Sequence, residues 1–134
     1  MNLIKIPSLN SNVVVSTSEI IRIEAVRNYS RVYFTDGTKM VALKVLQWFE
    51  KSLPASMFVR VNRSHLINMQ FVKTIKGIDT KTLLMDSGDY IVVSRRKKDR
   101  LQYLIERSLE CNSNYPNLAL VLYTTQFFPF KPLI

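Results

Sequence analysis

Hydrophobic positions along this chain fall into short runs rich in β-branched residues, and turn-forming residues separate the runs. Runs of this kind predict β-strands rather than helices. The predicted strands are residues 3–6, 12–16, 19–25, two arms within 30–43, 58–61, 71–78, 82–85 and 90–94. Asp36-Gly37 and the stretch from Asp86 to Asp89 separate consecutive runs, and such residues tolerate the positive backbone angles of tight turns. Two hairpins, and hence a mainly antiparallel sheet, are therefore expected.

Two segments follow a helical period instead. Apolar residues recur at roughly helical spacing in residues 44–53 and stop before Pro54, which predicts a short amphipathic helix. We predict Ser94 as the N-cap of a second helix that runs to about Leu109. The expected fold is therefore an all-β, mainly antiparallel domain over residues 1–110, with one or two short helices at its edges.

The C-terminal residues 111–134 differ in chemistry from the rest of the chain. They are dense in apolar residues, and of nineteen Lys and Arg residues only Lys131 lies beyond residue 110. We expect Leu118 to Tyr123 of this extension to form a strand that packs against the domain or across a dimer interface, because exposed apolar density is an aggregation hazard. A flexible tail is the alternative.

The length of 134 residues suits a single domain with one hydrophobic core. Apolar runs stay well short of the roughly 20 residues that a membrane-spanning helix needs, and the N-terminus lacks a secretory signal pattern. Cys111 is the single cysteine of the sequence, which excludes an internal disulfide and a zinc site built on several thiolates. These features predict a cytoplasmic protein.

Charge points to a class of partner. Nineteen Lys and Arg residues against ten Asp and Glu residues give a formal net charge of +9. Such a field attracts polyanions, so nucleic acid is the first candidate partner and an anionic membrane surface is the second. Catalysis finds little support, because His65 directly follows Ser64 and adjacent side chains point in different directions. We expect no enzymatic activity, no metal and no cofactor.

Three polar clusters interrupt the apolar pattern. The first cluster is Arg27-Asn28-Tyr29-Ser30-Arg31, between a predicted strand and the first arm of a hairpin. Its cations, amide, phenol and hydroxyl suit contacts to phosphates and to base edges or sugars. A solvated turn is the alternative reading of this cluster by itself.

The second cluster is the stretch from Asn62 to His65, which follows the strand FVRV. If that strand ends at Val61, these residues leave the sheet together as a projecting turn. The planar fork of Arg63 on such a turn matches a phosphate or the acceptor pair of guanine. Alternatively, Arg60 and Arg63 are surface charges, and Asn62 and Ser64 cap a helical turn.

The third cluster, Ser94-Arg95-Arg96-Lys97-Lys98, places four cations at a predicted helix N-terminus. That end of a helix carries partial positive charge and normally prefers acidic residues. The arrangement becomes favourable if an external phosphate docks there, because free backbone N–H groups and side chains then meet the same anion. A tolerated small electrostatic penalty is the alternative.

Three stretches carry these clusters in a particular order and spacing: IEAVRNYSRVYFTDG, LPASMFVRVNRSHLIN and YIVVSRRKKDRL. Together they resemble the LytTR family of bacterial DNA-binding domains, which occurs in transcriptional regulators. The resemblance covers roughly residues 12–105. Its middle motif, F-x-R-V-x-R-S-x-x-I/V-N, is fairly specific.

The resemblance implies an elongated, mostly β domain that places loops, rather than a recognition helix, into successive major grooves and bends the DNA. It implies DNA contacts from the matching positions Asn28, Tyr29, Ser30, Arg63, Ser64 and Arg95, with the basic neighbours of Arg95. Asn62, His65 and Lys97 depart from the family pattern, so base preference does not follow from the resemblance. Most members carry a receiver domain, for which this length leaves no room. We therefore expect a free-standing regulator or a fragment of a longer one.

The predicted function is transcriptional regulation through sequence-specific binding of duplex DNA by three loops. Arg63 and Arg95 are expected to contact base edges. The residues expected to supplement them are Asn28, Tyr29 and Ser30, and those expected to hold phosphates are Arg27, Ser64, Arg96 and Lys98. The expected partner is double-stranded DNA with paired direct repeats, bound by a monomer or a homodimer, without a membrane or a small-molecule substrate.

RNA binding is the main alternative, because Tyr29, Tyr33 and Phe34 offer aromatic stacking platforms. We expect Val32 and Phe34 to face the core instead. A module that binds any polyanion through charge is the other alternative, and it would show no sequence preference.

Overall fold

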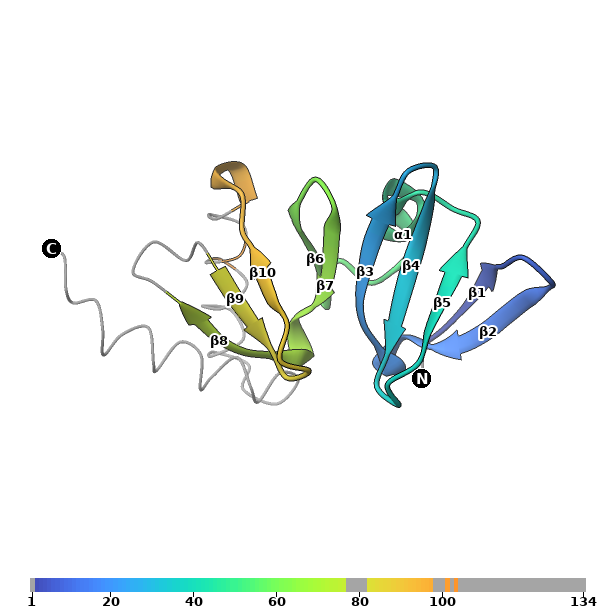
Figure 1. The fold of residues 1–134 in the computed structure, drawn as a ribbon, viewed down its shortest axis with the longest axis horizontal. Coiled ribbons are helices and arrows are strands. Elements are labelled where there is room, and N and C mark those ends of the chain that lie inside the picture. The colour runs from blue at the N-terminus through green and yellow to red at the C-terminus, as the bar shows by residue number, and fades with distance from the viewer. Residues whose placement is uncertain (1, 77–81, 98–100, 102, 104–134) are drawn as a thin grey trace, which may run out of the picture. The chain divides into compact units, whose positions relative to one another are not determined.

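The computed structural model describes residues 2–76, 82–97, 101 and 103. The chain divides into two compact units, one up to Asn68 and one from Met69 onward, and each is described by itself. Figure 1 shows mostly strands in the described part of each unit. None of the helices within the described residues is both long and apolar enough to cross a membrane.

The described part of the first unit contains a two-stranded ribbon and a five-stranded antiparallel sheet. The ribbon pairs β1 (Leu3–Pro7) with β2 (Asn12–Ser16), and a single 3-10 turn, Thr17–Glu19, leads into the sheet. The sheet has the strand order β5-β4-β3-β7-β6. Its strands are β3 (Ile20–Val26), β4 (Tyr29–Phe34), β5 (Lys39–Ala42), β6 (Phe58–Asn62) and β7 (His65–Asn68).

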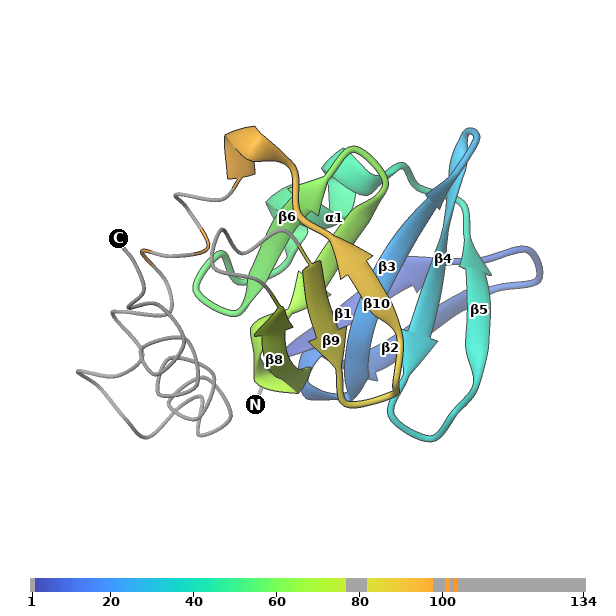
Figure 2. The ribbon, with the colours of Figure 1, turned by 60° about the vertical axis from the view of Figure 1, so that its left-hand side comes forward.

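One face of this sheet packs into the hydrophobic core. Successive side chains of a strand point to opposite faces, and in β4 this alternation buries Ser30 and Val32. Figure 2 shows the two-stranded β1–β2 sheet and the helix α1 (Leu46–Ser52) behind the five-stranded sheet, on the core face. Phe49 of α1 is fully buried there, and its ring meets Trp48 edge-on with centroids 4.9 Å apart. Burying a side chain of this size contributes about 1.5–3 kcal/mol.

The described part of the second unit holds a three-stranded antiparallel sheet in the order β10-β9-β8. Its strands are β8 (Val72–Lys76), β9 (Thr82–Met85) and β10 (Tyr90–Val92), preceded by the 3-10 turn Met69–Phe71. Residues 95–97, 101 and 103 are helical. Inward residues of the strands are buried, among them Leu83, Met85 and Ile91.

Both predicted hairpins are confirmed. In the first, Gly37 has φ +88° and donates its N–H to Phe34 O at 3.1 Å. In the second, Gly88 has φ +96° and donates to Met85 O at 2.9 Å. Glycine lacks the Cβ that makes this backbone region costly. The mainly antiparallel β fold and the short helix within residues 44–53 are confirmed as well.

One strand, β7, was not predicted. The sequence indicated a projecting turn over residues 62–65, but β6 continues to Asn62 and β7 begins at His65, so the turn shortens to Arg63-Ser64. A register shift between Arg60 and Asn62 makes this tight reversal fit. The predicted helix from Ser94 to Leu109 is described only in part, and the extension 111–134 lies outside the described residues.

Candidate nucleic-acid interface

The first and second clusters meet at one end of the five-stranded sheet. Arg27 and Asn28 form the turn between β3 and β4, and Arg63 and Ser64 form the turn between β6 and β7. β3 pairs antiparallel with β7, so the end of β3 lies beside the start of β7. The N–H of Ala25, near the end of β3, donates to the carbonyl oxygen of Ser64 at 2.8 Å and ties this end of β3 to the β6–β7 turn. Figure 1 shows both turns at the same end of the sheet, its upper edge in that view.

The β3–β4 turn presents two exposed polar side chains, those of Arg27 and Asn28. Arg27 has φ +57°, in the left-handed region. This conformation costs a residue with a side chain about 1–2 kcal/mol relative to the right-handed one. Tyr29 begins β4 and is half-buried. The turn therefore projects Arg27 and Asn28 away from the sheet, at some local cost in backbone energy.

Ser30 lies on the core face of β4 and is fully buried. Its hydroxyl donates to the carbonyl oxygen of Lys44 at 2.7 Å. This bond fixes the β5–α1 connection to the same end of the sheet as the two turns. Lys44 was not predicted as a site residue. The hairpin register could have identified it, because a turn centred on Asp36 places Ser30 opposite Ala42, next to this connection.

The β6–β7 turn is organised by Asn62. The Oδ1 atom of Asn62 accepts the backbone N–H of Ser64 at 2.7 Å, and the Nδ1 atom of His65 lies 3.2 Å from the same oxygen. An Asn side chain that bonds the backbone two residues ahead mimics a backbone turn. Arg63 and Ser64 remain exposed at its tip. The turn is thus short and held at both ends, as a rigid presenting element requires.

A charge network covers the outer face of the sheet next to the turns. The Oε1 atom of Glu24 accepts a hydrogen bond from the Tyr33 hydroxyl at 2.9 Å and lies 3.6 Å from Nη1 of Arg31. The Oε2 atom of Glu24 lies 3.9 Å from Nε2 of His65. Hydrogen bonding with Tyr33 raises the pKa of Arg31, with a smaller contribution from Glu24. The network joins β3, β4 and β7 beneath the turns.

Two aromatic side chains of β4, those of Tyr33 and Phe34, contact other groups of the first unit. The guanidinium of Arg22 stacks over the Tyr33 ring, 3.8 Å from its centroid, a favourable cation–π geometry. Phe34 packs against the core, and Val32 is fully buried. The expectation that Val32 and Phe34 face the core is confirmed. This arrangement leaves Tyr33 and Phe34 poorly suited to stack on nucleotide bases.

The third cluster belongs to the second unit. Arg95 and Arg96 are exposed, and Lys97 is half-buried. Helical residues begin at Arg95, and the N–H of Lys97 donates to the carbonyl oxygen of Ser94 at 3.1 Å. The cations therefore do stand at the start of a helical segment, as predicted. Lys98 lies outside the described residues.

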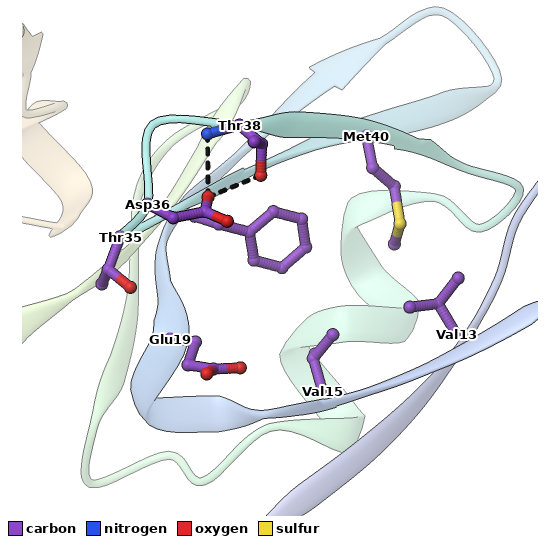
Figure 3. Close-up of a pocket in the computed structure, with 8 residues that line it drawn as sticks. Val13, Val15, Glu19, Thr35, Asp36, Thr38 and Met40 are labelled. Atoms are coloured by element: carbon purple, nitrogen blue, oxygen red, sulfur yellow. Dashed lines mark hydrogen bonds between the residues drawn. The ribbon is translucent and has the colours of Figure 1, made fainter.

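A cavity of about 220 Å³ opens at the other end of the first unit, where Ile20 pairs with Phe34 (Figure 3). Apolar side chains of β2, β4 and β5 form much of its wall, together with Glu19 and Asp36. The carboxylate of Asp36 accepts hydrogen bonds from the N–H and hydroxyl of Thr38 at 2.9 and 2.6 Å, and these bonds lower its pKa. Two carboxylates disfavour a polyanion, so the cavity does not extend the basic surface.

This geometry indicates a class of protein, a domain that binds a polyanion through loops on a β scaffold. An antiparallel β scaffold displays short, anchored turns that carry Arg, Asn and Ser, and a basic helical start lies in the second unit. Loops on a rigid scaffold are a common way to present binding residues. The positive side chains suit a polyanion, and their planar and amide groups suit hydrogen bonding to nucleotides.

Comparison with known proteins identifies the family. Residues 10–106 match the LytTr DNA-binding domain. The chain is 34% identical over 97 residues to the sensory transduction protein LytT of Bacillus subtilis. This alignment covers 71% of this chain and 40% of LytT. It is 31% identical over 94 residues to the CO-responsive transcriptional regulator RcoM of Rhodospirillum rubrum, covering 68% of this chain and 39% of RcoM.

The fold agrees with that match. A solved LytTr DNA-binding domain from a methyl-accepting/DNA response regulator of Bacillus cereus aligns with a TM-score of 0.66 and 24% identity, covering 78% of this chain and 97% of that one. The chain belongs to the LytTR family of DNA-binding domains. It spans about 40% of the length of the LytT and RcoM relatives.

Proposed function

We propose that this domain recognises a specific sequence of duplex DNA by placing three loops into successive major grooves. The observation that carries the proposal is the pairing of β3 with β7, which sets the turns bearing Asn28 and Arg63 side by side. Two anchored polar turns at one sheet end form a compact reading surface. Side chains on such turns lose little freedom when they bind, which favours specific over diffuse contact.

Arg63 and Arg95 are the proposed contacts to base edges. Both side chains are exposed, and a guanidinium can donate two parallel hydrogen bonds to the O6 and N7 atoms of guanine. Asn28 is suited to the N6 and N7 atoms of adenine by the same geometry. Tyr29, half-buried beside Asn28, is proposed to supplement these contacts.

Phosphate contacts are proposed for Arg27, Ser64, Arg96 and Lys98, which flank the base-reading positions in sequence. The described members of this set are exposed. Lys44 is added to them because Ser30 ties its backbone to the same sheet end. Ser30 itself is assigned a positioning role, since its buried hydroxyl is already bonded to Lys44.

Transcriptional regulation is the proposed role of the protein that contains this domain. LytT is named as a sensory transduction protein and RcoM as a transcriptional regulator, and each shares this domain-sized region with the chain. We further propose that the operator consists of paired direct repeats occupied by two copies of the domain.

Selection of bound sequences from a random pool of duplexes tests the proposal. The expected result is a defined motif, recovered as two direct repeats, and a selected duplex that outcompetes single-stranded RNA of equal length. A pool that stays random after repeated selection, with equal binding of all polyanions, would identify a general charge-driven module. Preferential binding of the RNA would favour the stacking alternative.

A further inference from the structure

Arg60 does not project toward solvent from β6 but folds beneath the β6–β7 turn. Its Nε atom donates to the carbonyl oxygen of Asn62 at 3.0 Å, and its Nη2 atom donates to the carbonyl oxygen of Arg63 at 2.8 Å. Its Nη1 atom donates to Oε1 of Glu50 at 3.1 Å. One guanidinium therefore ties together two turn carbonyls and the helix α1.

This contact constrains the residue that the proposed function assigns to base reading. The carbonyl oxygen of Arg63 accepts a hydrogen bond from the Arg60 guanidinium, while the Arg63 side chain remains exposed to solvent. The Asn62 carbonyl is held by the same group, and the Asn62 side chain closes the turn onto the N–H of Ser64. The backbone on both sides of the turn is thus fixed before any ligand arrives.

The guanidinium shape is essential to this arrangement. Its donors lie in one rigid plane and can meet three acceptors in fixed directions, whereas a Lys ammonium is a compact point charge on a flexible stem. Glu50 also balances the charge of Arg60 at 3.1 Å, and the Arg60 side chain is 23% exposed. Arg60 is therefore poorly placed to add to the attraction of phosphates.

We propose that Arg60, braced by Glu50, is a positioning residue that sets the backbone of the β6–β7 turn so that Arg63 reaches a base edge. This inference rests on the proposed function, since it requires that Arg63 reads DNA. It assigns specificity to a residue that does not touch the DNA. It also gives α1 a role beyond the core, because α1 supplies the carboxylate that orients the guanidinium.

The test is a double-mutant cycle in the full chain, with Arg60→Lys, Arg63→Ala and the combined variant. Binding is measured to the selected duplex and to a scrambled duplex over a range of salt concentrations. Arg60→Lys should weaken binding to the selected duplex by roughly three- to tenfold, the cost of ordering a turn whose backbone was previously fixed. Binding to the scrambled duplex and the salt slope should stay unchanged, and the loss should vanish in the Arg63→Ala background.

Two further variants complete the design. Glu50→Ala alters a side chain that is 41% exposed, so folding is expected to be retained, and it should cause a smaller loss of the same kind. Glu19→Ala is the matched control for Glu50→Ala, because Glu19 is also an exposed carboxylate of this unit but lies in the wall of the cavity at the end away from the turns. Its specificity ratio should not change.

The outcomes separate the two proposals. A selected motif together with an unaltered specificity ratio in Arg60→Lys would overturn the positioning role and leave the DNA-binding proposal intact. So would an equal loss of binding to the scrambled duplex, which marks a contact that does not depend on sequence, or a loss that adds fully to that of Arg63→Ala. Failure of the unmodified chain to select any motif would overturn both.

Discussion

The backbone N–H of Ala25 donates a hydrogen bond to the carbonyl oxygen of Ser64 at 2.8 Å, and this contact ties the end of β3, just before the β3–β4 turn, to the β6–β7 turn. Because both partners are main-chain atoms, the spacing of the turns does not depend on which side chains they carry. Asn28 and Arg63 can therefore vary without moving the frame that presents them.

Replacing Arg95 by Ala should relax selection at one position of the DNA site. A bidentate contact to guanine contributes about 1–3 kcal/mol of discrimination against the wrong base. Lys98→Ala should instead weaken binding to all sequences alike and flatten the salt slope by about one unit. Binding to a panel of single-base variants checks both expectations. A uniform loss for Arg95→Ala would remove Arg95 from the set of base contacts.

The salt dependence of the unmodified domain follows from the phosphate contacts proposed for Arg27, Ser64, Arg96, Lys98 and Lys44. Four of these residues are cations. One further cation from the three polar clusters brings the number of neutralised phosphates to about five. Log K should then fall with log salt at a slope of roughly −4 to −5. Titration by fluorescence anisotropy at several salt concentrations measures the slope. A value near zero is incompatible with a phosphate-gripping surface.

Lys44→Ala should weaken binding to every duplex and reduce the salt slope by about one unit, as expected for the loss of one phosphate contact. Lys39→Ala is the matched control, because Lys39 pairs with Tyr33 toward the opposite end of the sheet. Its salt slope should equal that of the unmodified domain. Equal effects of the two substitutions would indicate a diffuse field rather than a located contact.

Arg27→Gly should separate stability from binding. Glycine stabilises the fold by removing the left-handed penalty of about 1–2 kcal/mol at φ +57°. It also destabilises the fold by about 0.4–1 kcal/mol, because it increases the conformational entropy of the unfolded chain. The net free energy of unfolding should stay equal or rise by about 1 kcal/mol, whereas DNA affinity should fall. Asn28→Gly, at a position without positive φ, should lower stability instead. Chemical denaturation of both variants provides the measurement, and a clear loss of stability in Arg27→Gly would contradict it.

Ser30→Ala should act on stability rather than directly on DNA. It removes the hydrogen bond to the Lys44 carbonyl at 2.7 Å, and a bond of this kind contributes about 1 kcal/mol. Ser64→Ala is the comparison, because Ser64 is exposed at the turn tip. It should leave the unfolding midpoint in place and weaken binding. If Ser30→Ala preserved stability but weakened binding to the selected duplex, Ser30 would contact DNA directly and supplement the base contacts, as the sequence first suggested.

Local sequence patterns were sufficient for most of the fold. The hairpin around Gly37 and the one around Gly88 follow from turn residues between alternating runs, and the helix α1 follows from its apolar spacing before Pro54. The missed strand, β7, begins with His65 and ends with Asn68. Asn68 is buried, and its amide avoids a desolvation penalty by donating to the carbonyl oxygen of Ile20 at 2.9 Å. No local pattern indicates that a distant strand supplies this acceptor.

The candidate site likewise depends partly on local sequence patterns and partly on contacts between distant segments. The sequence by itself determined which turns would be polar and basic, because turn chemistry and side-chain alternation act between near neighbours along the chain. Only the tertiary structure decided that Asn28 and Arg63 would be adjacent, that Ser30 would be buried and that Arg60 would turn inward to Glu50. Each of these depends on pairing β3 with β7 or packing α1 on the sheet, and such long-range contacts are set by the burial of the whole core rather than by any single segment.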